Sequence, residues 1–391
     1  MNRVEARGHE QAIIEAGRHL EEHGWAVIPD VVSAEESTSI QSKVWACLEK
    51  VSRGRVSRAD ATTWQGAKFF KAMKGILMEP SPIYHCEGMW DARVAMAPYF
   101  AHLYGDAELA TSMDRLNIYP APNGADIKEK QVGAWLHTDQ TPLRNGRCCI
   151  QGFLDLEGTG PLDGGLMVAD KSHLKHHELL FREWKIQESG NWILFTDEQR
   201  ATIEANFTIL KVQCPPRSLV LWESRVFHYN QPPVIGGHAR FVIYVCMQPW
   251  AHSKKSDEAK AKKIIAYSSM RGTSHWPLDS KLFSMYARSY GEPLADYDMS
   301  PDTIMQPLLY ENKTIARLVG FENGPVIEWG ANGRPLPALH MDAPQLLGLA
   351  KPALLKLLGV APTSKKRKGP RQDADTPQPV KKKGRITISL V

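Results

Sequence analysis

The feature that most constrains this chain is a His-x-Asp pair, His137 and Asp139, followed later by another histidine, His228. Side chains two apart on an extended segment point to the same side, so both groups can reach one metal ion without a bend in the backbone. Two imidazoles and one carboxylate are the ligand set of a mononuclear non-haem iron site, which leaves further coordination positions open. A lone His-x-Asp pair also occurs by chance in solvated loops and in hydrolytic metal sites. The pair therefore needs support from the rest of the sequence.

The segment around His228 supplies that support because it is typical of a strand, a turn and a second strand. Apolar β-forming residues occupy 219–222, two prolines and two glycines interrupt 232–237, and β-forming residues resume at 241–245. His228 comes just before the break, and Arg240 opens the returning strand. Taken singly, His228 is explained as a core histidine and Arg240 as a surface cation. Taken together and in this order, His228 suits a metal ligand and Arg240 suits a guanidinium on the neighbouring strand. Such a guanidinium can bind a carboxylate through two parallel hydrogen bonds.

Arg225 is a competing anchor for such a carboxylate, since it lies three residues before His228. On a regular strand this odd offset places it on the opposite face from His228, which favours Arg240. A bulge or a turn between the two residues would reverse the argument.

At these positions the chain resembles the phytanoyl-CoA dioxygenase-like family of Fe(II)/2-oxoglutarate oxygenases, over most of the span 24–249. The resemblance includes a helix followed by the phrase at 24–32, and then a second helix that opens with a capping box from Ser33 to Glu36. It extends to the glycine-led strand and turn at 164–173. Asp170 and Lys171 replace the usual Pro-Gly of that turn, which leaves His173 either a turn residue or a residue near the substrate.

The resemblance implies specific roles for the residues already singled out. The catalytic iron ligands would be His137, Asp139 and His228. The co-substrate 2-oxoglutarate would bind to Arg240, with Gln151 and Thr138 at positions that can line its pocket. Many family members carry a hydroxyl residue two places after the distal histidine, where this chain has Asn230.

The order of elements predicts a mainly β fold with surrounding helices. We expect helices near 9–22, 34–50, 91–104 and 173–188, and short β-runs from about 113 to 248. A β-rich centre with helices around it is typical of a double-stranded β-helix, a jelly-roll of the cupin kind, with the iron at its mouth. The expected divisions are an N-terminal helix at 1–23, the jelly-roll domain at 24–250, a helical extension at 251–360 that packs on or caps the barrel, and a disordered basic tail at 361–391.

The basic tail carries two clusters of Lys and Arg, at 364–371 and 381–385, around an acidic, proline-containing spacer. This composition is too polar to fold alone and resembles a two-part nuclear import signal, with an import receptor as partner. The alternative is a solubilising tail or a weak contact with nucleic-acid phosphates. The net charge of +5 owes much to this tail, so the body offers no basic groove. We expect a nuclear or cytoplasmic protein.

Cysteine usage and hydropathy agree with this expectation. The six cysteines are scattered without a Cys-x-x-Cys pair, which favours reduced thiols in a reducing compartment. No apolar run suits a signal peptide or a membrane span. We therefore expect no membrane partner.

The predicted function is hydroxylation of a C–H bond in an unidentified small molecule, with consumption of O2 and 2-oxoglutarate and release of succinate and CO2. One alternative is a nuclear oxygenase that acts on a nucleic-acid base or a protein side chain. Another is a catalytically silent binding or scaffold protein on the same fold. A zinc hydrolase shares the ligand set, but it needs no arginine for a carboxylate and does not explain the glycine-led strand. The fold does not select among substrates.

Overall fold

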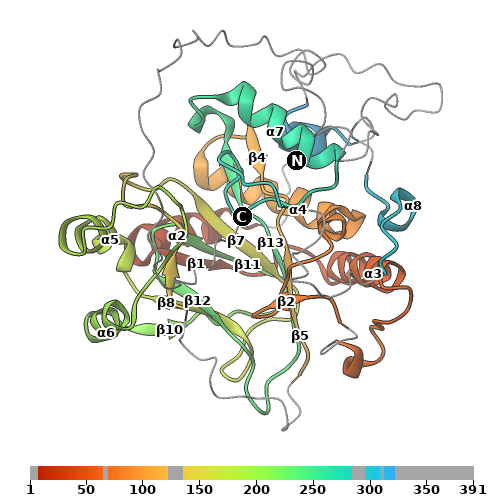
Figure 1. The fold of residues 1–391 in the computed structure, drawn as a ribbon, viewed down its shortest axis with the longest axis horizontal. Coiled ribbons are helices and arrows are strands. Elements are labelled where there is room, and N and C mark those ends of the chain that lie inside the picture. The colour runs from red at the N-terminus through yellow and green to blue at the C-terminus, as the bar shows by residue number, and fades with distance from the viewer. Residues whose placement is uncertain are drawn as a thin grey trace, which may run out of the picture.

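The centre of the protein consists of two antiparallel β-sheets surrounded by helices (Figure 1). The computed structural model describes residues 8–64, 69–121, 135–283, 296–307, 309 and 312–321. The larger, nine-stranded sheet has the order β1-β11-β7-β13-β5-β3-β2, with β14 and β4 beside it, and the smaller, five-stranded sheet has the order β10-β8-β12-β6-β9. Two sheets that share one apolar interior form the predicted double-stranded β-helix, so the fold prediction is confirmed.

The strands alternate between the two sheets along much of the chain, as a jelly-roll requires. In chain order the strands are β1 Trp25–Ile28, β2 Ala72–Met73, β3 Ile76–Leu77, β4 Leu109–Thr111, β5 Leu116–Tyr119, β6 His137–Thr138, β7 Ile150–Asp155, β8 Gly165–Ala169, β9 Ile193–Leu194, β10 Ile209–Lys211, β11 Ser218–Glu223, β12 His228–Gln231, β13 Arg240–Tyr244 and β14 Met247–Pro249. The helices are α2 Glu10–His23, α3 Ala34–Val51, α4 Glu87–Tyr104, α5 Ser172–His177, α6 Asp197–Asn206, α7 Ser256–Ser268, α8 Pro301–Ile304 and α9 Lys313–Val319.

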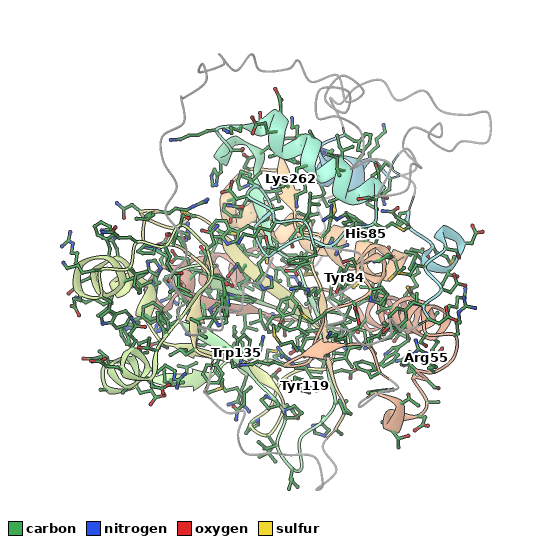
Figure 2. All side chains as sticks on the ribbon, viewed as in Figure 1. Arg55, Tyr84, His85, Tyr119, Trp135 and Lys262 are labelled. Carbon is green, nitrogen blue, oxygen red and sulfur yellow. The ribbon has the colours of Figure 1, made fainter. Side chains whose placement is uncertain are left out.

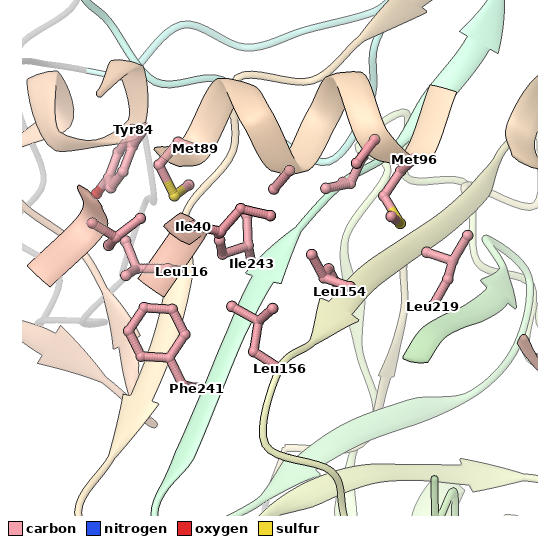
Figure 3. Packing of buried hydrophobic residues seen from close by; sticks show 14 of the residues in the cluster. Ile40, Tyr84, Met89, Met96, Leu116, Leu154, Leu156, Leu219, Phe241 and Ile243 are labelled. Atoms are coloured by element: carbon pink, nitrogen blue, oxygen red, sulfur yellow. The ribbon is translucent and has the colours of Figure 1, made fainter. Parts of the chain in front are cut away.

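Side-chain alternation on the larger sheet separates two cores. On β13, Val242 and Tyr244 face the interior between the sheets and pack with residues of both sheets. Ile243 points the other way and packs with α3 and α4. Figure 3 shows this outer core, with Met89 and Met96 of α4 above the sheet. The helices therefore cover the outer face of the larger sheet and leave its inner face for the site.

The predicted helix starts are mostly right, and the capping box explains one of them. The Ser33 hydroxyl accepts a hydrogen bond from the Glu36 backbone at 3.1 Å, and the Glu36 carboxylate accepts one from the Ser33 backbone at 2.7 Å. The helix expected at 173–188 is shorter, because α5 passes into a π-helical turn at Glu178–Glu183. α6 lies inside the region expected to be only β.

The first helix and the segment after the barrel pack against the same core as the barrel. Ile13 and Leu20 of α2 and Leu318 of α9 belong to one apolar cluster with the outer face of the larger sheet. The expected domain limits remain predictions. Residues 322–391 lie outside the described part of the chain, and they include the end of the expected extension and the whole basic tail. None of the described helices is long and apolar enough to cross a membrane.

Two histidines outside the central site should make folding sensitive to acid. Burial lowers the pKa of His85 to about 3 and that of His176 to about 4, whereas an unfolded histidine titrates near 6.5. Their stabilising effect is fully present above pH 6.5 and is lost as pH falls toward the folded pKa, because only the unfolded chain takes up the protons. Between pH 7.5 and pH 5.0 we expect each to cost about 2 kcal/mol of the free energy of unfolding.

Urea unfolding of wild type and of His85→Asn at the two pH values checks this expectation. The variant should lose about 2 kcal/mol less than the wild type over this interval. An equal loss in both proteins would show that His85 does not titrate in this way.

Candidate metal centre

His137, Asp139 and His228 come together at two neighbouring strands of the smaller sheet, β6 and β12. β6 and β12 pair so that His137 and His228 are direct cross-strand neighbours, with ring centres 4.3 Å apart. Asp139 Oδ1 lies 3.8 Å from His137 Nε2, and Asp139 Oδ2 lies 3.5 Å from His228 Nε2. Each of the three residues is only 4% exposed. One donor atom from each lies within 4.8 Å of the others, which is close enough to hold one metal ion.

Hydrogen bonds orient both imidazoles toward this common point. His137 Nδ1 lies 3.0 Å from the Trp135 carbonyl, and His228 Nδ1 lies 2.9 Å from the Val226 carbonyl. A backbone carbonyl can only accept, so each Nδ1 carries the proton and each Nε2 presents its lone pair. This is the tautomer that binds a metal through Nε2.

The charges of the cluster also fit a divalent cation. Burial, aided by the neighbouring His228 ring, lowers the pKa of His137 to about 3, so this imidazole is neutral near pH 7. Burial opposes ionisation of Asp139, but contact with His228 and His137 outweighs it and lowers the pKa of the carboxyl. The neutral imidazole of His137 and the ionised carboxylate of Asp139 are thus ready to bind without losing protons.

Gln151 and Trp276 hold Asp139 in place. The Gln151 amide on β7 donates to Asp139 Oδ2 at 3.1 Å, and the Trp276 indole N–H donates to the Asp139 carbonyl at 3.0 Å. Gln151 was predicted to line the co-substrate pocket, and in the structure its amide contacts the predicted aspartate ligand. Trp276 is buried, and its contact with the site was not predicted from the sequence.

Removal of the Gln151 amide should therefore weaken metal binding. We expect Gln151→Leu to lower the affinity for Fe(II) or Mn(II) about tenfold, because the carboxylate loses the donor that orients it. Metal titration followed by the electron paramagnetic resonance signal of free Mn(II) measures the change. Gln248→Leu is the matched control, since the Gln248 amide donates to the Cys148 carbonyl instead. Equal affinities in the two variants would contradict this role.

Arg240 forms a second part of the site. It is 1% exposed, and its Nη1 donates to Asn230 Oδ1 at 3.3 Å. Its Nε and Nη2 are buried without a hydrogen-bond partner among the described residues. The nearby Asp155 carboxylate is bonded by Thr159 and Gly158 instead. Buried guanidinium donors without a partner are costly, so two parallel open donors fit the carboxylate of a bound anion.

Asn230 was left without a role by the sequence, and the structure gives it one. It lies on β12 two residues beyond His228, and its side chain links Arg240 to the Tyr244 hydroxyl, to which its amide donates at 2.8 Å. The amide thus fixes the guanidinium in the barrel interior. The sequence indicated a role for Asn230 only through its position, which many family members fill with a hydroxyl residue.

The other predicted positions make contacts elsewhere. The Thr138 hydroxyl donates to the Ser224 carbonyl, so its role at the co-substrate pocket remains a prediction without a supporting contact. The rival anchor Arg225 is paired with the buried Glu223 carboxylate. His173 Nε2 lies 3.0 Å from the Glu21 carbonyl and so ties the turn after β8 to helix α2.

A second cluster, Asp114, Cys246 and His275, also has ligand atoms within 4.8 Å of one another. Here His275 Nδ1 is already paired with Asp114. Although burial opposes it, the Asp114 carboxylate raises the pKa of His275 well above its usual range. The buried cations Arg93 and Lys263 also interact with Asp114. Because Asp114 pairs with a charged imidazole and also interacts with two buried basic groups, the cluster favours an ion pair over a metal site.

The sequence of the chain is similar to characterised proteins. The phytanoyl-CoA dioxygenase (PhyH) family model matches residues 20–232. Ava biosynthesis cluster protein O of Aspergillus versicolor is 26% identical over 236 residues, which cover 58% of this chain and 74% of that protein.

Solved structures show a weaker likeness. EctD from S. alaskensis with 2-oxoglutarate and 5-hydroxyectoine is 16% identical, covers 72% of this chain and 85% of its own, and has a TM-score of 0.41. The carbocyclase SnoK from nogalamycin biosynthesis is 15% identical, covers 60% of this chain and 83% of its own, and has a TM-score of 0.40. The family match spans more than half of the chain and includes both histidines and the aspartate of the cluster, so the chain belongs to the phytanoyl-CoA dioxygenase family of Fe(II)/2-oxoglutarate-dependent oxygenases.

Proposed function

We propose that this protein hydroxylates a C–H bond of a small molecule, with His137, Asp139 and His228 as the iron ligands and Arg240 as the anchor of 2-oxoglutarate. The observation that carries the proposal is the buried Arg240 guanidinium with two open donors. It is linked through Asn230 to the strand that holds His228. A dicarboxylate needs such a cation at one end and a metal at the other.

When bound, iron and 2-oxoglutarate supply the oxidising chemistry, with release of succinate and CO2. The chain itself supplies three ligands on one face, which leaves the remaining coordination positions to exchangeable molecules. Arg240 holds the far carboxylate and so fixes the direction from which the co-substrate approaches the metal. Phe153, Trp222 and Tyr244 line the barrel interior and keep it dry, which strengthens the ion pair with Arg240.

The structural contacts favour this reaction over a zinc hydrolase. A hydrolase needs the metal and a water but has no use for an unpaired guanidinium buried in the barrel. The charge of Arg240 has no compensating acid within salt-bridge distance among the described residues. A bound dianion would compensate it.

We also propose that the small molecule is free rather than part of a nucleic acid or a protein. Support comes from the charge of the sequence, which concentrates its basic excess in the tail at 361–391. Nuclear import, with an import receptor as partner, and a contact between this tail and nucleic acid both remain predictions, since the tail lies outside the described residues.

An anaerobic titration of the metal-free protein with Fe(II) and then 2-oxoglutarate tests the proposal. We expect a weak visible charge-transfer band of the chelate to appear in the wild type and to be absent in His228→Ala. Release of succinate in air then identifies substrates. A folded, iron-loaded protein without the band would contradict the proposal and favour a hydrolytic or silent role.

A further inference from the structure

Two large apolar side chains remain exposed beside the metal centre. Trp192 is 43% exposed and Leu194 is 45% exposed, and they lie at β9, the edge strand of the smaller sheet. Exposed apolar side chains scattered over a surface need no explanation, but here two of them gather beside one candidate ligand. We call Trp192 and Leu194 the apolar edge.

Strand register shows which way the apolar edge faces. Leu194 pairs directly with His137 across the β6–β9 ladder, and residues directly opposite in an antiparallel pair share one face. The Trp192 ring lies 5.9 Å from the His137 ring, between centres. Ile193 points to the other face and is buried in a separate apolar cluster with aromatic side chains such as Phe195 and Phe227. The apolar edge therefore lies on the same face as the metal ligand.

The other flank of His137 is closed. Trp135 stacks on the His137 ring with centres 4.9 Å apart and an angle of 16° between planes. Its indole N–H donates to the Asn230 carbonyl on β12, and Lys74 Nζ lies 4.1 Å from its ring centre (Trp135 is labelled in Figure 2). Trp135 is thus engaged on several sides. The open surface next to His137 belongs to Trp192 and Leu194.

The side chains of the apolar edge determine which kind of molecule binds there favourably. An indole ring and a branched alkyl group offer stacking and apolar contact, and they present little hydrogen bonding to a charged group. A negatively charged body would lose hydration there without gaining hydrogen-bond partners. A flat apolar ring would exclude water from the apolar edge and from the metal at once.

We propose that the apolar edge binds the body of the substrate, and that the substrate is an apolar small molecule with at least one ring and without a negative charge at that ring. The inference rests on the proposed function, because it places this molecule beside His137 as an iron ligand. It goes further by naming the substrate class and the residues that select it.

The test uses Mn(II) as a paramagnetic ion in the metal site and indole as the probe. Protein loaded with Mn(II) and 2-oxoglutarate should broaden the proton signals of indole strongly, because the ring binds close to the ion. Trp192→Ser combined with Leu194→Ser should reduce this broadening about tenfold, as apolar contact area is lost. Methanesulfonate, a small anion without a ring, should show little broadening with any of the proteins.

Phe181→Ser is the matched control, since Phe181 is an exposed aromatic residue on a different element, 38% exposed. Phe181→Ser loaded with Mn(II) should broaden the indole proton signals as strongly as the wild type does. Three results would each overturn the inference: equal broadening of indole in the double variant, broadening of methanesulfonate as strong as that of indole, or no broadening of indole by the Mn(II)-loaded wild type. Failure of the proposed function looks different: Mn(II) would then bind equally well to the wild type and to His228→Ala, whatever happens to indole.

Discussion

Arg240→Gln is expected to weaken the binding of 2-oxoglutarate to the iron-loaded protein about 100-fold, without a change in iron affinity. The substitution removes the buried cation whose Nε and Nη2 have no partner among the described residues. Truncation of one partner of a buried charge pair costs about 2–5 kcal/mol, and 100-fold corresponds to about 2.7 kcal/mol. Anaerobic titration with 2-oxoglutarate, followed by the charge-transfer band, measures the effect.

Two other arginines sharpen this experiment. Arg217→Gln is the control, because Arg217 pairs with Asp30 at the surface and should leave 2-oxoglutarate binding unchanged. Arg225→Gln tests the rival anchor. If Arg225→Gln lost 2-oxoglutarate binding while Arg240→Gln retained it, the assignment of the anchor would be wrong.

The cluster of His137, Asp139 and His228 could be predicted because its geometry follows from local rules. Alternation along a strand places His137 and Asp139 on one face, and the break after His228 identifies a hairpin-like return. The same rule does not apply to Arg225, because this residue lies in the turn between β11 and β12; its pairing with Glu223 is what sets it apart from Arg240. The capping box at Ser33 was readable for the same reason, since its partners lie within one turn.

Contacts between distant segments could not be predicted in this way. Trp276 lies 137 residues from Asp139, and nothing in its neighbourhood in the sequence shows that its indole N–H reaches the Asp139 carbonyl. β1 was likewise missed as a strand of the larger sheet, because its four residues join the sheet only by pairing with β11. Such pairings depend on packing of the whole chain and leave no periodic signal in a short segment.

The role of Gln151 lies between these cases. The resemblance placed Gln151 at the co-substrate pocket, whereas in the structure its amide donates to the Asp139 carboxylate. A side chain that contacts a ligand residue acts on the metal first and on the co-substrate only through it. The type and position of Gln151 therefore indicated that it belongs to the site, but its hydrogen-bond partner could be identified only from the three-dimensional structure.

Asp139→Ala is expected to lower metal affinity on the order of 1000-fold, the largest effect in the site. The carboxylate is the only negative ligand of the cluster, and at an effective dielectric constant near 20 a unit charge at about 4 Å contributes about 4 kcal/mol. The two imidazoles would remain oriented by the Trp135 and Val226 carbonyls but would lack charge compensation for a divalent ion. Free Mn(II), measured by electron paramagnetic resonance during titration, reports the loss.

The second cluster provides the matched control for this prediction. Asp114→Asn keeps the shape of a buried side chain. Loss of one partner of a buried ion pair lowers the stability of the fold, but the folded variant should keep its metal affinity within about twofold, because Asp114 serves His275 as an ion-pair partner. Asp139→Ala removes a metal ligand, whereas Asp114→Asn removes only a neighbouring charge. If the Asp114 variant lost the metal and the Asp139 variant kept it, the ion would bind at Asp114, Cys246 and His275 instead. The assignment of His137, Asp139 and His228 as the metal ligands would then be wrong.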